Sequence, residues 1–587
     1  MGDEGNRTAY ALALRVVQEL WLAGVRDVVL APGSRSAPLA LVLHAADGAG
    51  DLRLHVRVDE RSAGFLALGL TTGSRRPVAV VTTSGTAVGN LLPAVMEAHH
   101  TGRRLVVVSA DRPDRLRGTG ANQTTEQAGI FGVFATCHDL TAGDEDARLR
   151  AAVAEACTSA GPTQLNLQLD GGLLPPDSDP GTWWTRPEDG GHRNDPATAG
   201  VLRPEDADHR NDPATAGVLR PEDGRHRDDP AMAGLARGDE DRVRLALGPR
   251  TVVVAGDGAG PAARLLAEAA NWPLVAEPTS GARIGRQAIR TGRLLLTTAL
   301  RDEVERVVVI GHPTLSRPVT GLLSDPGLEV LAVRGPDGVA TDPGRVATVL
   351  GAVPTVPGPD DPAWFSAWRG ADERLGALID AGVRTDSPLA VAAVVGRAVV
   401  GHATLVVGSS NPVRDLDVMA TPWPPLEHRF VVGNRGLAGI DGVVSTAVGV
   451  ALGRPGASRT IAYLGDLTFL HDTNGLLIGP GEPRPDLTLV VLSDDGGAIF
   501  STLEQGDRTY ASAFERVFGT PHGTDLQALC AAHHTAYERV TDLGRLGAAL
   551  DEQPSGIRVL EVPVSRADRR DEAAWLRDLA QQAVRPL

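Results

Sequence analysis

Short runs of β-branched and aliphatic residues alternate with helical stretches along three separate parts of this sequence. In the first part, residues 8–23 have the apolar spacing of a helix, and buried strands are predicted at 27–30, 78–82 and 105–109. Strands that are separated by helices form parallel sheets whose two faces are covered. The first part therefore predicts one doubly wound α/β domain.

The same alternation returns twice further along the chain. It predicts three doubly wound parallel-sheet α/β domains, at 1–180, 243–353 and 385–587, with a proline-rich linker region at 354–384. The later strands are predicted at 251–255, 306–311, 328–333, 404–408, 430–432, 460–465 and 487–492.

A tandem repeat separates the first two domains. Arg186-Pro187-Glu188-Asp189 recurs at 203–206 and 220–223, a period of 17 residues (203 − 186). Repeats that stack into a solenoid need an apolar face, and these units offer almost none. We therefore expect 181–242 to be a disordered or loosely ordered insertion.

The chain has no lysine, because all 57 of its basic residues are arginine. Schiff-base chemistry and the P-loop both need a lysine amine, so both are excluded. Anions must be bound by arginine, backbone N–H groups or a metal. The net charge of −16 argues against a nucleic-acid interface, which needs a basic face.

The sequence predicts a cytoplasmic protein. Its first residues are polar, and no apolar run reaches the roughly 20 residues that a membrane span needs. Its three cysteines are far apart and show no metal-ligand spacing. We therefore expect neither a membrane span nor structural disulfides.

Two aspartates follow predicted strands of the third domain. Asp466 and Asp494 are 28 residues apart (494 − 466) with a helical stretch between them. Both should lie at carboxyl ends of parallel strands, where open sheets bind ligands. With the backbone carbonyl of Gly496 they suit a hard cation such as Mg2+. Either aspartate alone is more simply a helix cap.

Gly465-Asp466, followed by Asp494 and the glycine pair Gly496-Gly497, resembles the signature of thiamine-diphosphate enzymes. The resemblance implies three α/β domains: pyrimidine-binding, central and diphosphate-binding. It also implies Mg2+ or Mn2+ held by Asp466, Asp494 and Gly496. The second ligand in that family is commonly asparagine, so Asp494 is a departure that adds negative charge beside a diphosphate.

Glu60 opens a predicted helix in the first domain. Taken alone, a glutamate at the start of a helix is explained by its favourable interaction with the helix dipole. In the thiamine-diphosphate family the matching glutamate bonds N1′ of the aminopyrimidine, which implies a catalytic role for Glu60. The resemblance further implies that Ile440 supports the bent cofactor. The remaining implied cofactor-binding residues are Thr83, Ser84, Gly85, Gly465, Leu467, Ile499 and Phe500.

An ordered set of motifs narrows the resemblance to the thiamine-diphosphate synthases of menaquinone biosynthesis. The resemblance implies a homodimer at least, with Glu60 and Asp466 from different subunits. It implies decarboxylation of 2-oxoglutarate and conjugate addition of the resulting succinyl-semialdehyde carbanion equivalent to isochorismate. The motifs are APGSRS (31–36), TSGTA (83–87), ADRP (110–113), GANQ (120–123), SNPVR (410–414), GNRG (433–436), GIDG (439–442) and FGTPHG (518–523).

Both implied substrates are dicarboxylates, and arginine forks match carboxylates best. Arginines at predicted strand-end turns are the candidates, although any one of them could be a solvated surface charge. By resemblance the substrate-binding set is Ser34, Arg35, Arg112, Gln123, Arg317, Ser410, Arg414 and Arg435.

Two other functions remain open at this point. The first is a different thiamine-diphosphate 2-oxoacid decarboxylase or an acetohydroxyacid synthase-like carboligase. Such an enzyme, acting on pyruvate, would not need the four arginines that the motifs supply, Arg35, Arg112, Arg414 and Arg435. The second is a scaffold whose metal site has drifted, for which Asp494 is the clue.

Overall fold

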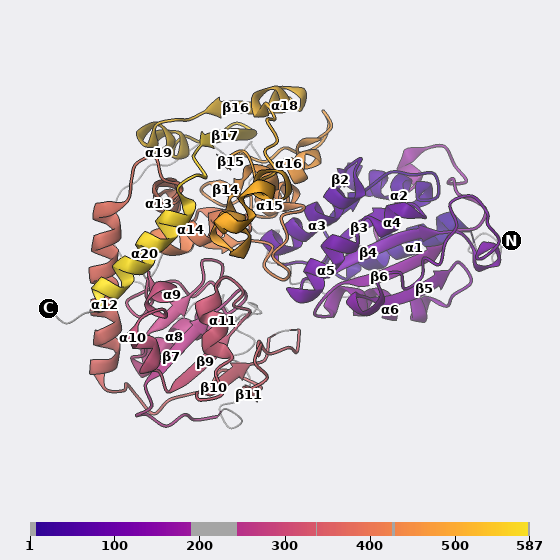
Figure 1. The fold of residues 1–587 in the computed structure, drawn as a ribbon. Coiled ribbons are helices and arrows are strands. Elements are labelled where there is room, and N and C mark those ends of the chain that lie inside the picture. The colour runs from indigo at the N-terminus through magenta and orange to yellow at the C-terminus, as the bar shows by residue number, and fades with distance from the viewer. Residues whose placement is uncertain (1–7, 189–242, 336, 425–428, 585–587) are drawn as a thin grey trace, which may run out of the picture.

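The fold was analysed in a computed structural model that describes residues 8–188, 243–335, 337–424 and 429–584. Three lobes follow one another along the chain (Figure 1). Each contains one sheet, and every pair of neighbouring strands in these sheets runs parallel. The predicted class, three parallel-sheet α/β units in series, is confirmed.

The N-terminal sheet has six strands in the order β2-β1-β3-β4-β6-β5. Its strands are β1 (Asp27–Leu30), β2 (Arg53–Val56), β3 (Val78–Thr82), β4 (Leu105–Asp111), β5 (Thr136–Thr141) and β6 (Thr163–Gln168). Its helices are α1 (Ala9–Leu22), α2 (Ala37–Gly48), α3 (Glu60–Ser74), α4 (Thr86–Gly89), α5 (Leu92–His100) and α6 (Asp146–Thr158).

The central sheet has five strands in the order β11-β10-β9-β7-β8. Its strands are β7 (Thr251–Ala255), β8 (Leu274–Ala276), β9 (Arg306–Ile310), β10 (Glu329–Val333) and β11 (Thr348–Leu350). Its helices are α8 (Gly260–Ala270), α9 (Gly292–Leu295), α10 (Ala299–Asp302) and α11 (Arg317–Leu323).

The C-terminal sheet has six strands in the order β13-β12-β14-β15-β17-β16. Its strands are β12 (Thr404–Val407), β13 (Phe430–Val432), β14 (Thr460–Gly465), β15 (Leu487–Ser493), β16 (Ala536–Arg539) and β17 (Ile557–Pro563). Its helices are α13 (Pro388–Ala398), α14 (Asn411–Met419), α15 (Val443–Gly453), α16 (Asp466–His471), α17 (Ala511–Phe514), α18 (Leu526–Ala532), α19 (Leu543–Asp551) and α20 (Arg569–Ala583).

A long helix, α12 (Pro362–Gly382), runs beside both the central and the C-terminal lobes (Figure 1). Its buried Phe365, Trp368 and Leu375 belong to one apolar core that includes strands of both sheets. Burial of large side chains on both sides ties the two lobes together. The region 354–384, predicted as a linker, thus carries a helix with a buried face.

The N-terminal lobe meets the C-terminal lobe through α3 and α15, which lie side by side. Glycines let the two backbones approach. A Cβ atom on Gly69 would lie 2.2 Å from the carbonyl oxygen of Thr446, and one on Gly449 would lie 2.2 Å from that of Leu66. Neither position has room for a larger residue. Helix α3 begins at Glu60, the residue predicted to be catalytic.

Most of the repeat insertion predicted at 181–242 lies outside the described residues. Its first part is described, and there Trp184 is buried and donates from its ring nitrogen to Asp51 at 2.7 Å. Within the described ranges, no helix is long and apolar enough to cross a bilayer.

Candidate active site

Asp466 and Asp494 come together at the carboxyl end of the C-terminal sheet. Strands β14 and β15 are parallel neighbours, with Gly465 in register with Leu492. Asp466 is buried and begins α16. Its Oδ2 accepts the N–H groups of Asp494 at 3.0 Å and Gly496 at 3.2 Å, while its Oδ1 accepts that of Leu467 at 2.6 Å. The carboxylate of Asp466 therefore stabilises the turn that carries Asp494.

The surroundings of Asp494 fit a divalent cation. Burial, followed by the charge of Asp466, raises the pKa of Asp494 to about 7, against the lowering influence of Arg569 and Arg566. Its Oδ1 is buried and has no hydrogen-bond partner. A cation between the two carboxylates would satisfy this oxygen and remove the repulsion.

The protein alone does not complete that metal site. In the described part of the chain, no group of three or more His, Cys, Asp or Glu side chains could hold a metal. Mg2+ wants about six oxygens and keeps several that are not protein side chains. The remaining ligands would be the carbonyl of Gly496, a diphosphate and water.

Glu60 lies at the contact between the N-terminal and C-terminal lobes. It is half-buried at the start of α3, and Asn90 donates to its carboxylate at 3.4 Å. The helix is capped by Asp59, which accepts the N–H groups of Arg61 and Ser62. The position of Glu60 is thus determined by a capped helix of fixed direction.

The first turn of α3 is bonded to the segment that follows α16. Arg61 donates to the carbonyl of His471 at 2.7 Å, and Ser62 donates to the buried carboxylate of Asp472 at 3.0 Å. Asn474 donates to Asp59 at 2.7 Å. The structure therefore places Glu60 and Asp466 on elements that are joined by hydrogen bonds.

The turn at Thr83, Ser84 and Gly85 is held from within the N-terminal lobe. Ser84 donates to the carbonyl of Gln123 at 3.0 Å, and the side-chain amide of Gln123 donates to the carbonyl of Ser84 at 2.8 Å. Gly85, with φ of 82°, donates its N–H to Gln127. Gln123, predicted to bind substrate, uses its amide to brace this turn.

Two arginines of the predicted substrate set share one region. Arg435 is buried and donates to the hydroxyls of Ser409 at 3.3 Å and Thr314 at 2.8 Å, while its Nε has no partner. Burial, followed by the charges of Arg435 and Arg293, lowers the pKa of Arg414 to about 10. Arg435 is buried and Arg414 is half-buried. Within the described residues no carboxylate is bonded to either guanidinium, and two such cations are suited to an anionic ligand.

Arg414 is also anchored by its own helix start. It donates to the carbonyl of Ser410 at 2.7 Å, and Ser410 has a φ of 74°. This left-handed conformation is uncommon for serine and persists only where the surroundings enforce it. Ser410 thus contributes its carbonyl to the placement of the arginine.

Ser34, Arg35 and Arg112 form a second group of predicted substrate residues, on the N-terminal lobe. Arg35 donates to the carbonyl of Leu169, and burial, then the charge of Arg112, lowers its pKa. Ser34 beside it is exposed. Over the described ranges, no hydrogen bond or ion pair joins this group to Arg414 or Arg435.

Arg317 differs from the expectation most clearly. Its guanidinium makes two bonds to Glu504, at 2.6 and 3.0 Å, and the two side chains are 72% and 69% exposed. An exposed ion pair is a surface feature with little energetic weight. In this structure the charge of Arg317 is partnered at the surface.

Ile440 lies in the loop between β13 and α15, and Ile499 and Phe500 lie in the short helix that follows the turn of Asp494. The rings of Phe500 and Phe518 pack against each other, with their centroids 5.8 Å apart. This packing connects the segment after the turn of Asp494 to the 518–523 motif.

The N-terminal part of the chain, residues 11–130, matches the thiamine pyrophosphate enzyme family, N-terminal TPP binding domain. A 2-succinyl-5-enolpyruvyl-6-hydroxy-3-cyclohexene-1-carboxylate synthase from Nocardioides sp. is 48% identical, with 97% of each chain covered. Another, from Kineococcus radiotolerans, is 45% identical, with 95% of this chain and 96% of the relative covered. The chain belongs to this synthase family.

A solved structure shares the fold of this synthase. Benzoylformate decarboxylase from Polynucleobacter necessarius aligns with a TM-score of 0.58, covering 95% of this chain and 99% of its own. The two chains are 18% identical, so the likeness concerns the fold alone.

Two further residues, Arg566 and His522, lie near Asp466 and the turn that carries Asp494. Arg566, between β17 and α20, donates to the carbonyl of Asp494 at 3.4 Å and to that of Asp495, and it pairs with Glu515. His522 Nε2 lies 3.4 Å from Oδ2 of Asp466. His522 belongs to the 518–523 motif, whereas nothing in the local sequence of Arg566 indicates its role.

Proposed function

We propose that the protein is a thiamine-diphosphate-dependent transferase that decarboxylates 2-oxoglutarate and adds the remaining four-carbon fragment to isochorismate. The products are 2-succinyl-5-enolpyruvyl-6-hydroxy-3-cyclohexene-1-carboxylate and CO2. The observation that carries the proposal is the bonding of the helix that begins at Glu60 to the segment after α16, which begins at Asp466. One end of this contact suits a pyrimidine and the other a metal-bound diphosphate.

The protein's part in the reaction is to bind, orient and exclude water. The cofactor, when bound, supplies the electron sink for decarboxylation, which no side chain of this chain can offer. Glu60 would hold a proton at N1′ of the pyrimidine. Asp466, Asp494 and the carbonyl of Gly496 would hold Mg2+ or Mn2+. Ile499 and Phe500 would keep water from the reacting carbon.

The remaining cofactor residues have backbone and packing roles in this proposal. The turn at Thr83, Ser84 and Gly85 would line the pyrimidine side. Gly465 and Leu467 flank Asp466, and the start of α16 would face the diphosphate. Ile440 would support the bent cofactor.

Substrate carboxylates would be bound by arginine. Arg435 is buried, Arg414 is half-buried, and the charge of Arg435 acts on Arg414. In the described part of the chain neither has a carboxylate partner, as a dicarboxylate site requires. Arg35 and Arg112 form a second group that would take another carboxylate. CO2 release from 2-oxoglutarate should therefore greatly exceed release from pyruvate, and equal rates would favour a pyruvate-type carboligase.

Replacing Arg414 tests this assignment. Arg414→Ala should raise the KM of one dicarboxylate substrate about tenfold or more, because a charge-assisted hydrogen bond contributes about 1.5–3 kcal/mol. The affinity for thiamine diphosphate should stay within a few-fold. Arg397→Ala, which removes an exposed arginine from α13, serves as the matched control. An unchanged KM in Arg414→Ala would remove this residue from the substrate site.

We further propose a homodimer in which Glu60 of one subunit acts with Asp466 of the other. The structure describes the α3–α15 contact within one chain, and in a domain-swapped dimer the same contact would be made by two chains.

Mixing two inactive variants distinguishes these arrangements. Co-refolded Glu60→Gln and Asp466→Asn subunits should regain activity, because one site of each mixed dimer would carry both changes and the other neither. Activity that stays lost would show that each chain supplies both residues to its own site.

We propose a cytoplasmic location. Cys137, Cys157 and Cys530 are free thiols, which suits a reducing compartment.

A further inference from the structure

The loop between β13 and α15 carries Arg435 and Ile440, yet its backbone is held from the N-terminal lobe. Glu97, on α5, accepts the N–H of Gly436 at 2.7 Å through Oε1 and that of Leu437 at 2.8 Å through Oε2. Both oxygens of one carboxylate thus bind consecutive amides. Hydrogen bonds to a carboxylate are about twice as strong as neutral ones.

Glu97 is only 4% exposed, so these bonds lie inside the protein. Burial raises its pKa to about 7, although the two N–H groups lower it. A buried carboxylate is costly unless it is fully hydrogen-bonded. The buried carboxylate of Glu97 therefore depends on the loop, whose two N–H groups are its hydrogen-bond partners.

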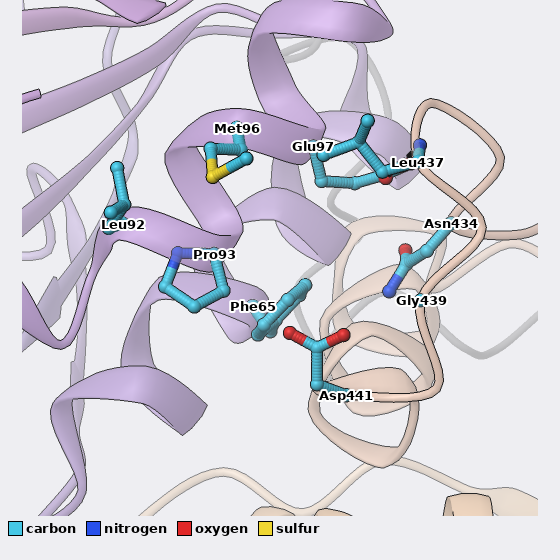
Figure 2. Close-up of a pocket in the computed structure, with 9 residues that line it drawn as sticks. All are labelled: Phe65, Leu92, Pro93, Met96, Glu97, Asn434, Leu437, Gly439 and Asp441. Atoms are coloured by element: carbon cyan, nitrogen blue, oxygen red, sulfur yellow. Dashed lines mark hydrogen bonds between the residues drawn. The ribbon is translucent and has the colours of Figure 1, made fainter. Parts of the chain in front are cut away.

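The loop fits closely against α5. A Cβ atom on Gly436 would lie 2.8 Å from Cβ of His100, so only glycine allows this approach. Further along, α5 and the loop border a cavity of about 210 Å³. Figure 2 shows Leu92, Pro93 and Met96 on one side and Asn434 and Asp441 on the other.

Arg435 immediately precedes the first bonded amide. Its guanidinium donates to the hydroxyls of Ser409 and Thr314, and among the residues that the structure describes it forms no ion pair. Hydroxyl bonds are weaker and less directional than a carboxylate fork. The backbone of the loop must therefore determine where this guanidinium lies.

We propose that Glu97 is a positioning residue for Arg435, holding the 433–442 loop so that the guanidinium meets a substrate carboxylate. The proposal rests on the proposed function, because it assumes that Arg435 binds substrate. Glu97 itself touches neither substrate nor cofactor. Through Glu97, a residue of the N-terminal lobe would determine the position of Arg435 in the C-terminal lobe.

A double-mutant cycle on the holoenzyme tests the inference. Glu97→Gln keeps the shape but turns an NH2 group toward a backbone N–H, and it should lower kcat/KM about tenfold, mainly through KM. Arg435→Ala should lower kcat/KM at least as much. In the double variant, Glu97→Gln should add almost nothing, because residues that act through one another are not additive.

The outcomes separate this inference from the proposed function. If Arg435→Ala leaves the kinetics unchanged, the substrate role of Arg435 and the inference both fall. If the two effects multiply in the double variant, Glu97 has a general structural role and only the inference falls. Glu97→Asp, which withdraws the same charge by one methylene, replaces Glu97→Gln in the cycle if that variant does not fold.

Discussion

Glu60→Gln should reduce turnover by about 10²–10⁴-fold, the usual contribution of a positioned acid–base group. Glutamine fits the same space at the start of α3 but cannot hold a proton at N1′ of a bound pyrimidine. The cap by Asp59 and the bonds of Arg61 and Ser62 do not involve the Glu60 side chain, so the fold should persist. The measurement is kcat together with Mg2+-dependent cofactor binding by calorimetry.

A second readout follows the chemistry apart from turnover. Exchange of the C2 proton of thiamine diphosphate, followed by NMR after quenching, should slow in Glu60→Gln in parallel with kcat. Glu145→Gln, at an exposed glutamate before α6, is the matched control and should behave as wild type. Normal exchange and turnover in Glu60→Gln would show that another group performs the proton step.

Asp466→Asn should abolish metal-dependent cofactor binding. The change removes a buried charge and turns an NH2 group toward one of the N–H groups that Asp466 now accepts. Even groups outside the metal's ligand shell cost 10–100-fold in affinity, so loss of a ligand should cost more than about 100-fold. Calorimetric titration of thiamine diphosphate with and without Mg2+ measures the loss.

Asp494→Asn is the matched comparison, and we expect a far smaller effect. Asparagine retains an oxygen for the metal and removes the buried charge, whose burial and repulsion by Asp466 raise the pKa of Asp494. Arg566 and Arg569, whose charges lower that pKa, would remain. Equal losses in Asp466→Asn and Asp494→Asn would contradict the distinct roles assigned here. No metal-dependent heat in the unaltered protein would support a scaffold with a drifted site.

The strands and the proximity of Asp466 to the turn of Asp494 could be predicted because their causes are local. Buried strands appear as continuous apolar runs, and the chain position at which β14 and β15 end determines where Asp466 and Asp494 lie. Glu60 was found through its place at a helix start and through the family resemblance. These features need no knowledge of distant contacts.

The rest depends on contacts between residues far apart in sequence. Glu97 lies within a helix and has no motif, so its bonds to Gly436 and Leu437 leave no trace in the local pattern. Arg317 was predicted to reach the substrate, but Glu504 lies close enough to pair with it. An arginine in a sequence does not reveal which carboxylate will be its neighbour.

The most direct test of the account is to follow both halves of the reaction in one sample. The protein, thiamine diphosphate, Mg2+, 2-oxoglutarate and isochorismate are mixed, and CO2 release is recorded together with the loss of isochorismate absorbance. The proposed reaction releases one CO2 for each isochorismate consumed, and we expect no loss of isochorismate when any component is omitted. CO2 release while isochorismate persists would contradict it, because the carbon acceptor would then be a different molecule.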